Sequence, residues 1–180
     1  EGVLVQLGII AFCSMAAEGA MFDWSGVYFR EVILAPDSLI IVGYASFMIM
    51  MATGRFVGDR IIAKIGRKKM LQASGIFVVT GLMISVLFPY LVTATIGFLI
   101  VGFGVSSVIP TVYSTAAKSS KTAPGMALAG VSSIGFLGFL LGPPIIGYIA
   151  QAASLQYSFA FVALFGVCIT VIVSKLKVLD

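Results

Sequence analysis

The chain has 180 residues, of which 60% are hydrophobic and only 10% are charged, with a net charge of +4 and no histidine. A soluble domain carries about a quarter charged residues, so a chain this apolar would expose large hydrophobic patches in water. Its continuous apolar runs exclude a membrane β-barrel, and without histidine no Ser-His proteolysis, haem ligation or ordinary zinc site is expected.

The apolar runs predict an all-α membrane protein with six transmembrane helices. Each spanning helix needs about 20 mainly apolar residues, and turn residues such as Ala35-Pro36-Asp37 and Phe88-Pro89-Tyr90 separate the runs. We expect a single domain over residues 1–180, whose helices cover approximately 3–31, 38–60, 70–88, 91–117, 124–150 and 155–174. No metal, cofactor or catalytic site is expected, and we do not interpret the chain as an enzyme.

The first predicted helix carries a carboxylate, Glu18, inside the hydrocarbon. Glu18 lies 15 residues after Val3, about 22 Å along a helix. An uncompensated charge there costs roughly 2.5–3.5 kcal/mol on insertion scales. Because we expect no basic residue in the membrane interior to pair with it, we interpret Glu18 as a group that binds a proton or a polar solute. At 100° per residue it shares one polar stripe with Ser14, Phe22 and Ser25.

The outer end of the same helix carries Asp23, Trp24 and Arg30. Arg30 follows Asp23 by seven residues and shares its face, so an interfacial Asp23–Arg30 ion pair is the simpler interpretation of Asp23. Trp24 fits two roles, since an indole stacks on a sugar-like ligand or anchors a helix at the membrane interface.

The fourth predicted helix is the other polar one. Pro110 interrupts it among Ser106, Ser107, Thr111 and Tyr113, which predicts a bent segment lining a cavity. The six helices therefore run polar, small-residue, apolar and then polar, small-residue, apolar, which predicts a three-plus-three internal repeat with the first helix of each triplet lining a pathway.

Positive charge orients the predicted helices. Because successive helices end on alternate sides of the membrane, the basic residues fall into two sets, and one side holds only Arg30. The other side holds ten: Arg55, Arg60, Lys64, Arg67, Lys68, Lys69, Lys118, Lys121, Lys175 and Lys177. Lys and Arg concentrate in cytoplasmic loops, so both termini are expected in the cytoplasm. Membrane topology explains the basic charge, and no nucleic acid partner is expected.

The loop between the second and third helices resembles the best-known signature of the major facilitator superfamily, which runs roughly Gly-x-x-x-Asp-Arg-x-Gly-Arg-Arg. The residues that match it follow in the same order: Gly54, Asp59, Arg60, Gly66, Arg67 and Lys68. The spacing differs, because Gly66 comes seven positions after Asp59 instead of about three. The stretch from Glu18 to Ser25 resembles the seventh helix of a bacterial subgroup related to sugar permeases. Gly142-Pro143-Pro144-x-x-Gly147 resembles the eleventh helix.

The resemblance implies the C-terminal six-helix half of a transporter in the bacterial inner membrane, with the N-terminal half as its missing partner. It implies that the three-plus-three repeat within this half is inverted. It implies that the Asp59–Arg60 loop latches the two halves together, although Arg and Lys would orient the loop in any case. We expect transport of a small polar or amphipathic solute by alternating access, with symport of protons through Glu18. A non-transporting six-helix assembly or regulatory protein is the alternative. The isolated chain, embedded in a lipid bilayer, is expected to self-associate through its small-residue faces.

Overall fold

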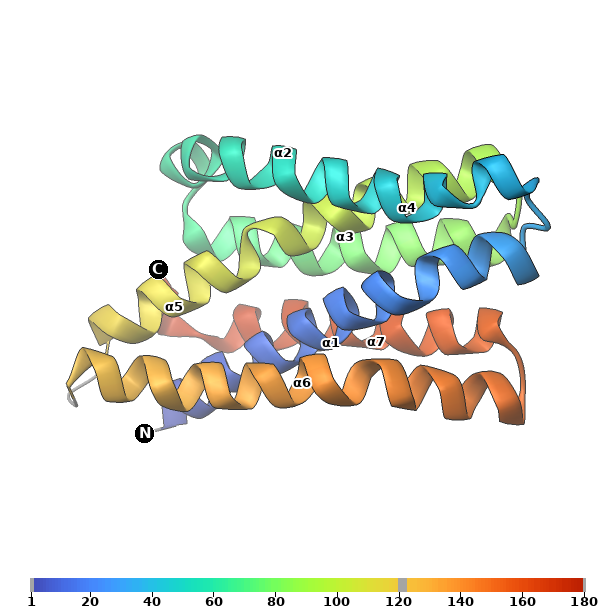
Figure 1. Cartoon of the computed structure of the whole chain (residues 1–180). Helices are drawn as coiled ribbons and strands as arrows, with labels where there is room; N and C mark the ends of the chain where they lie inside the picture. Colours follow the sequence, from blue (N-terminus) through green and yellow to red (C-terminus); the bar gives the residue numbers. More distant parts are fainter. Residues whose placement is uncertain (1, 120–122, 180) are drawn as a thin grey trace.

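The computed structural model describes residues 2–119 and 123–179, and all regular structure in this part of the chain is helical. Lys121, counted above among the basic residues, lies outside the described residues. The elements form one bundle of long helices (Figure 1), in this order: α1 (Gly2–Glu31), η1 (Asp37–Leu39), α2 (Ile41–Ile65), α3 (Arg67–Leu87), α4 (Leu91–Ser106), α5 (Val108–Ser119), α6 (Pro124–Ala152), α7 (Leu155–Lys175) and η2 (Lys177–Leu179).

Six segments of the described chain are long and apolar enough to cross a membrane: α1, η1 with α2, α3, α4 with α5, α6 and α7. The expectation of an all-α membrane protein with six spanning helices is thereby confirmed. The bounds differ most at the second helix, which was expected to end at Arg60 and runs on to Ile65. The third helix begins at Arg67 instead of residue 70.

Gly66 alone separates α2 from α3. Its φ of 86° lies in the left-handed region, which glycine enters without the Cβ clash that other residues suffer. The signature residues therefore do not form a loop. Gly54, Asp59 and Arg60 lie on the last turns of α2, and Arg67 begins α3, which explains why Gly66 follows Asp59 by one helical turn more than in the signature.

The fourth spanning segment is broken at Ser107, between α4 and α5. Pro110 has no N–H to donate to the carbonyl of Ser106, four residues earlier, so the helix loses a hydrogen bond at this point. The hydroxyl of Thr111 donates to the carbonyl of Ser107 at 2.6 Å, a side-chain bond of the kind that bends helices. The bend expected from Pro110 is present.

The helices pack in a regular pattern. α1 lies along α6, α2 lies along α4, and α3 packs against both α7 and α4, while α7 also contacts α1. Exchanging the first three spanning segments with the last three maps these contacts onto one another, which fits the expected three-plus-three repeat. In α1, 67% of the most apolar 18-residue stretch is buried, against 28% in the η1–α2 and α6 segments. The second and fifth spanning helices therefore present the open faces of the bundle.

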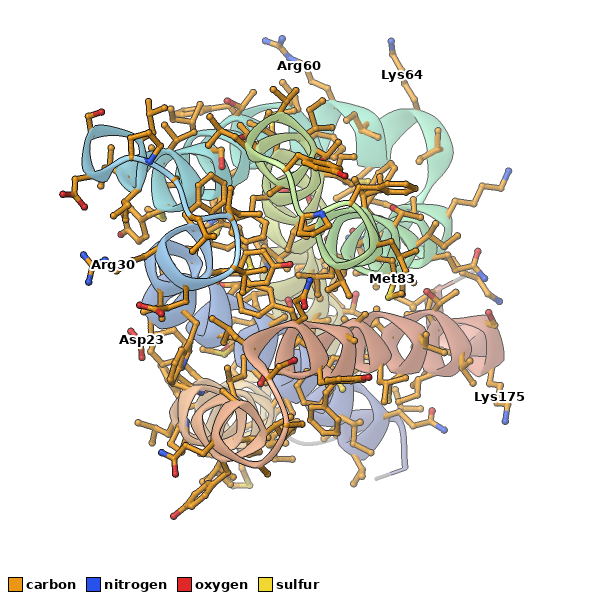
Figure 2. The ribbon with its side chains drawn as sticks, turned by 90° about the vertical axis from the view of Figure 1, so that its right-hand side faces the viewer. Asp23, Arg30, Arg60, Lys64, Met83 and Lys175 are labelled. Atoms are coloured by element: carbon orange, nitrogen blue, oxygen red, sulfur yellow. The ribbon has the colours of Figure 1, made fainter. Side chains whose placement is uncertain are left out.

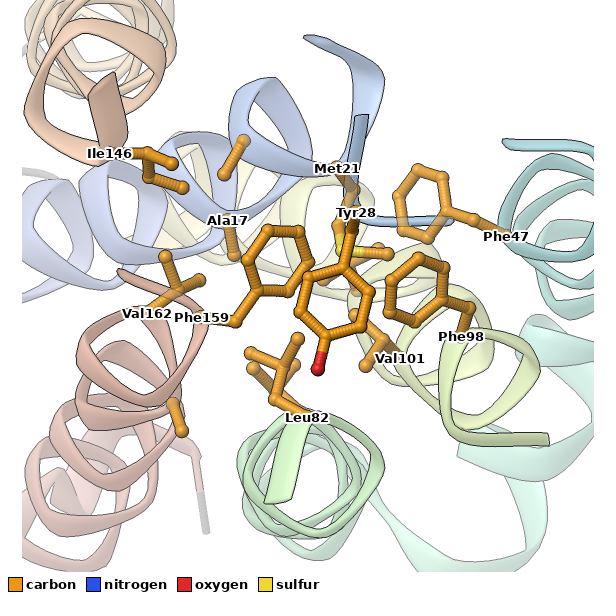
Figure 3. Packing of buried hydrophobic residues seen from close by; sticks show 14 of the residues in the cluster. Ala17, Met21, Tyr28, Phe47, Leu82, Phe98, Val101, Ile146, Phe159 and Val162 are labelled. Carbon is orange, nitrogen blue, oxygen red and sulfur yellow. The ribbon is translucent and has the colours of Figure 1, made fainter. Parts of the chain in front are cut away.

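An aromatic cluster holds the centre of the bundle together (Figure 3). Phe98 of α4 and Phe159 of α7 stack with their ring centroids 5.7 Å apart, and Tyr28 of α1 lies 4.4 Å from Phe159. The Tyr28 hydroxyl donates to the carbonyl of Ser85 on α3 at 2.8 Å. A buried phenol with a satisfied hydroxyl fixes α1 against α3, α4 and α7.

The ends of the bundle differ in charge. The N-terminal end of α1, the α2–α3 junction and the C-terminal ends of α5 and α7 all lie at one end (Figure 1). This end carries the basic side chains of the α2–α3 junction, and Arg60 and Lys64 extend away from the helices there (Figure 2). Arg30 lies near the C-terminal end of α1, at the opposite end of the bundle.

Candidate functional site

Glu18 lies in the buried middle of α1, with only 6% of its side chain exposed. Its Oε1 atom has no hydrogen-bond partner among the described residues, and neither have the hydroxyls of Ser14 and Ser25 on the same stripe. Ser14, one turn before Glu18, is close enough to act on it electrostatically but not in hydrogen-bond geometry. A buried polar atom without a partner costs about 1–3 kcal/mol, so the stripe carries an unmet hydrogen-bonding demand.

Arg55 of α2 is the basic residue that interacts electrostatically with Glu18. It lies ten residues before the end of α2, about 15 Å along the helix from Ile65, and not in a loop. It exerts a favourable Coulomb interaction on Glu18. Its Nη2 also donates to the sulfur of Met51 at 3.8 Å. The structure gives no ion pair between Glu18 and Arg55, whose side chain is exposed on α2, so its effect on Glu18 is a Coulomb interaction at longer range.

Phe22, one turn outward from Glu18, lies between α2 and α6. Its ring centroid is 5.7 Å from that of Phe47, 6.3 Å from that of Tyr44 and 6.0 Å from that of Phe139. The contacts with Phe47 and Phe139 are edge-to-face, and such contacts each add about 0.5–1.5 kcal/mol beyond area burial. The aromatic cluster thus packs α1 against both α2 and α6 one turn outward from Glu18.

The hydroxyls expected on the fourth helix are mostly bonded to their own backbone. Ser106 Oγ donates to the carbonyl of Phe103 at 2.6 Å, and it lies 3.5 Å from the Oγ of Ser107. Ser106, Ser107 and Thr111 are all at least 96% buried. Tyr113 is half-buried on α5 and lies within electrostatic range of Glu18. Of the predicted residues on this segment, Tyr113 is thus the one that the structure brings toward Glu18.

The glycines of α2 admit the bend of the fourth segment. A Cβ at Gly54 would collide with the side chain of Ser106, and a Cβ at Gly58 would collide with Ser107. The signature glycine Gly54 therefore lets α2 approach the α4–α5 break closely.

Two other signature residues meet beside the same break. Asp59 and Arg67 line a recess of about 280 Å³ together with Pro110, Thr111 and Ser114 of α5. Arg60 points away from the bundle instead (Figure 2). Gly66 forms the turn, and Lys68 lies on the first turn of α3. Asp59 and Arg67, the acid and the second base of the signature, thus both lie beside α5.

A larger recess of about 730 Å³ lies between the outer halves of α1 and α6. Trp24 of α1 lines it, and its Nε1 donates to the carbonyl of Pro143 at 3.1 Å. Asp23 also lines this recess, whereas Arg30 lines a different one with Asp37 and Tyr44. The structure gives no ion pair between Asp23 and Arg30, whose side chains are separate in Figure 2, because the two long faces of α1 adjoin different helices.

Arg55 is the residue that sequence reasoning missed as part of the site. It was counted with the charges of one membrane side, although the helix expected over 38–60 already contained it. Between Arg55 and Gly66 the sequence holds no proline or turn pair, and this signal would have extended the second helix past Arg60.

The fold of the chain is similar to that of solved peptide transporters. The crystal structure of the peptide transporter POT in complex with sulfate matches 96% of this chain and 37% of that chain, with a TM-score of 0.81 and 16% identity. The structure of the POT family transporter PepTSo matches the same shares with a TM-score of 0.81 and 12% identity. At these identities the likeness shows the fold alone.

Curated relatives share more of the sequence. An uncharacterised MFS-type transporter of Yersinia pestis is 37% identical over 164 residues, covering 91% of this chain and 43% of the relative. The membrane protein MosC of Rhizobium meliloti is 33% identical over 166 residues, covering 92% of this chain and 41% of that protein. The chain thus spans a little under half the length of the relatives it matches.

A family model covers nearly the whole chain. Residues 7–180 match the model of the Major Facilitator Superfamily. The Yersinia pestis relative and the solved structures named above are transporters and not enzymes, as expected above. The six spanning segments, the α2–α3 signature and these matches together show that the chain is a multi-pass membrane protein belonging to the major facilitator superfamily.

Proposed function

We propose that the chain is the C-terminal half of a secondary active transporter, which moves a small polar or amphipathic solute across the bacterial inner membrane by alternating access, with proton coupling through Glu18. The observation that carries the proposal is Glu18 itself. It is a buried carboxylate in the middle of a spanning helix, with one oxygen unpartnered and with Arg55 acting on it from α2. Intramembrane acids of this kind mark proton and solute pathways.

The open faces of the bundle support a second half as the partner. The segments with α2 and α6 are the least buried, and the relatives are about twice as long as this chain. Docking a second six-helix half on these faces would enclose the Glu18 stripe between the halves. The basic end of the bundle would then face the cytoplasm, together with both ends of the chain.

The charges on α1 and α2 supply a coupling step. An ionised Glu18 is attracted by Arg55, and a protonated Glu18 is not. Proton binding therefore releases Arg55 for another partner, and the cost of burying the carboxylate disappears at the same time. The α4–α5 break beside Asp59 and Arg67 provides a place where the bundle bends between an outward-open and an inward-open form, so these residues act as the latch.

The test uses the complete protein in proteoliposomes. Uptake of sugars, amines and drug-like solutes is measured with and without a pH gradient. Glu18→Gln should abolish gradient-driven uptake while leaving expression intact, because the amide keeps the shape but cannot exchange a proton. The matched control is Glu31→Gln, an exposed acid at the outer end of the same helix, which should transport normally. Unchanged proton dependence in Glu18→Gln would remove Glu18 from the mechanism, and no solute movement under any gradient would contradict transport.

A further inference from the structure

The recess between α1 and α6 holds a carboxylate with no basic neighbour. Asp23 lines it with Trp24, Phe139, Tyr148 and Gln151 and with the Pro143-Pro144 pair, and none of its lining residues is Lys or Arg. Arg30, the nearest basic residue along α1, lines a different recess. An acidic side chain in an otherwise neutral concavity gives the recess a negative potential, which concentrates cations.

Aromatic side chains flank this carboxylate. Trp24 comes from α1, and Tyr148 comes from α6 with 75% of its side chain exposed. The faces of indole and phenol rings attract cations, and an organic ammonium group within about 6 Å of such a face gains from both its charge and its methyl contacts.

The indole of Trp24 is held in one place. Its Nε1 donates to the carbonyl of Pro143, and its Cζ2 atom lies 3.2 Å from the position that a Cβ at Gly147 would take. A hydrogen bond and a close glycine contact therefore fix the ring against α6. Because the ring is already fixed, little conformational entropy is lost when a ligand binds to it.

Two backbone carbonyls of α6 add negative partial charge. Pro143 and Pro144 have no N–H groups, so the carbonyls of Phe139 and Leu140 lack their helical donors. The oxygen of Phe139 turns toward α1, where it lies 2.7 Å from the position of a Cβ at Gly19. Carbonyl dipoles freed in this way favour a positive ligand beside them.

We propose that this recess binds the ammonium group of a small organic cation, with Asp23 as the counter-charge and Trp24 and Tyr148 as aromatic walls. The solute class of the transporter is then a protonated amine or a quaternary ammonium compound. The inference rests on the proposed function, since it names the solute for a pathway that α1 also lines with Glu18.

The test measures equilibrium binding of radiolabelled choline to the complete protein in nanodiscs of phosphatidylglycerol, a lipid without an ammonium group. The competitor is 3,3-dimethylbutan-1-ol, which has the shape of choline without its charge. Choline should bind, and the neutral analogue should compete at least about tenfold more weakly. Asp23→Asn should weaken choline binding by at least about tenfold, and Trp24→Phe by about two- to fivefold.

The matched control is Asp37→Asn, which removes an acid from the recess of Arg30 and should leave choline binding unchanged. A second variant, Gly147→Ala, places a methyl group against the indole and should weaken choline binding without removing any charge. Equal binding of choline and its neutral analogue would overturn the inference. So would an Asp23→Asn protein that binds choline as tightly as the unaltered protein, or the absence of choline binding.

The ammonium group could come from a lipid headgroup or from a free solute. Adding phosphatidylethanolamine to the nanodiscs distinguishes these two sources. If phosphatidylethanolamine competes with choline in the unaltered protein but not in Asp23→Asn, the recess binds the lipid ammonium group. If phosphatidylethanolamine does not compete with choline, the recess binds a free solute. Both results support an ammonium site. Gradient-driven uptake that depends on Glu18, without choline binding, overturns this inference alone. Choline binding without any gradient-driven uptake contradicts the proposed function alone.

Discussion

Gly142→Ala is expected to strain the contact between α1 and α6. A Cβ at Gly142 would lie 2.5 Å from the carbonyl oxygen of Ala16 and 3.1 Å from its Cα. Both atoms belong to the backbone of α1 and cannot rotate away, so the two helices must separate. Ala16 lies two residues before Glu18, and the displacement therefore also reaches the candidate site.

Gly130→Ala is the matched control for this change. Gly130 lies on the same helix, and a Cβ there meets nothing within 4 Å. Both substitutions replace glycine by alanine inside a helix, which by itself stabilises by about 0.5–1 kcal/mol. This gain is common to both variants, so the difference between them isolates the packing cost. Overpacking by one methyl group typically costs about 1–3 kcal/mol, which is the difference expected here.

The assay is reversible unfolding of the purified complete protein by sodium dodecyl sulfate in mixed micelles, followed by far-ultraviolet circular dichroism. Gly142→Ala should unfold at lower detergent fraction than Gly130→Ala and should show slower solute uptake. Unfolding free energies that agree within about 0.5 kcal/mol would refute the close approach of α1 and α6 on which the site geometry rests.

Three further changes test the charges and the bend. Asp59→Asn should slow uptake by about fivefold or more without altering which solutes are taken up, because it changes a conformational balance; altered selectivity would count against the latch role. Pro110→Ala restores an N–H that can bond to the Ser106 carbonyl, so it should raise thermal stability by about 1 kcal/mol and reduce uptake, and unchanged uptake would show that the bend does not move. Arg55→Gln should reduce gradient-driven uptake while Arg55→Lys retains part of it, and equal uptake by both would exclude the Coulomb role of position 55.

The number of helices and the segregation of charge could be predicted from the sequence because both depend on local composition. Runs of apolar residues have to be about 20 residues long to cross the bilayer, and basic residues stay outside it. The bend near Pro110 was predictable for the same reason, since the missing N–H is a property of one residue.

The electrostatic interaction between Glu18 and Arg55 could not be predicted from local composition. Arg55 acts on Glu18 because α2 lies beside α1, and this neighbourhood depends on tertiary packing. The separation of Asp23 from Arg30 has a similar cause. Helical periodicity places them on one face, but α6 adjoins one of them and η1 with α2 adjoins the other.

The hydrogen bonds of the hydroxyl groups in the α4–α5 segment could not be predicted from the sequence either. Ser106 and Thr111 were expected to line a cavity because they are polar residues in an apolar span. In the structure both residues do line recesses beside α2, but both hydroxyls bond to carbonyls of their own segment, which satisfies them without a ligand. Sequence shows the polar groups of a span but not which of them are already paired.

The most direct test of the central claim is the water accessibility of position 18 in the complete protein. Glu18→Cys and, as a lipid-side control, Val171→Cys on the exposed face of α7 are made in a background lacking Cys13 and Cys168. A membrane-impermeant methanethiosulfonate should label position 18 and leave position 171 unlabelled, because only the former faces an aqueous pathway. Labelling at position 18 that is no faster than at position 171 would contradict a solute and proton pathway past Glu18.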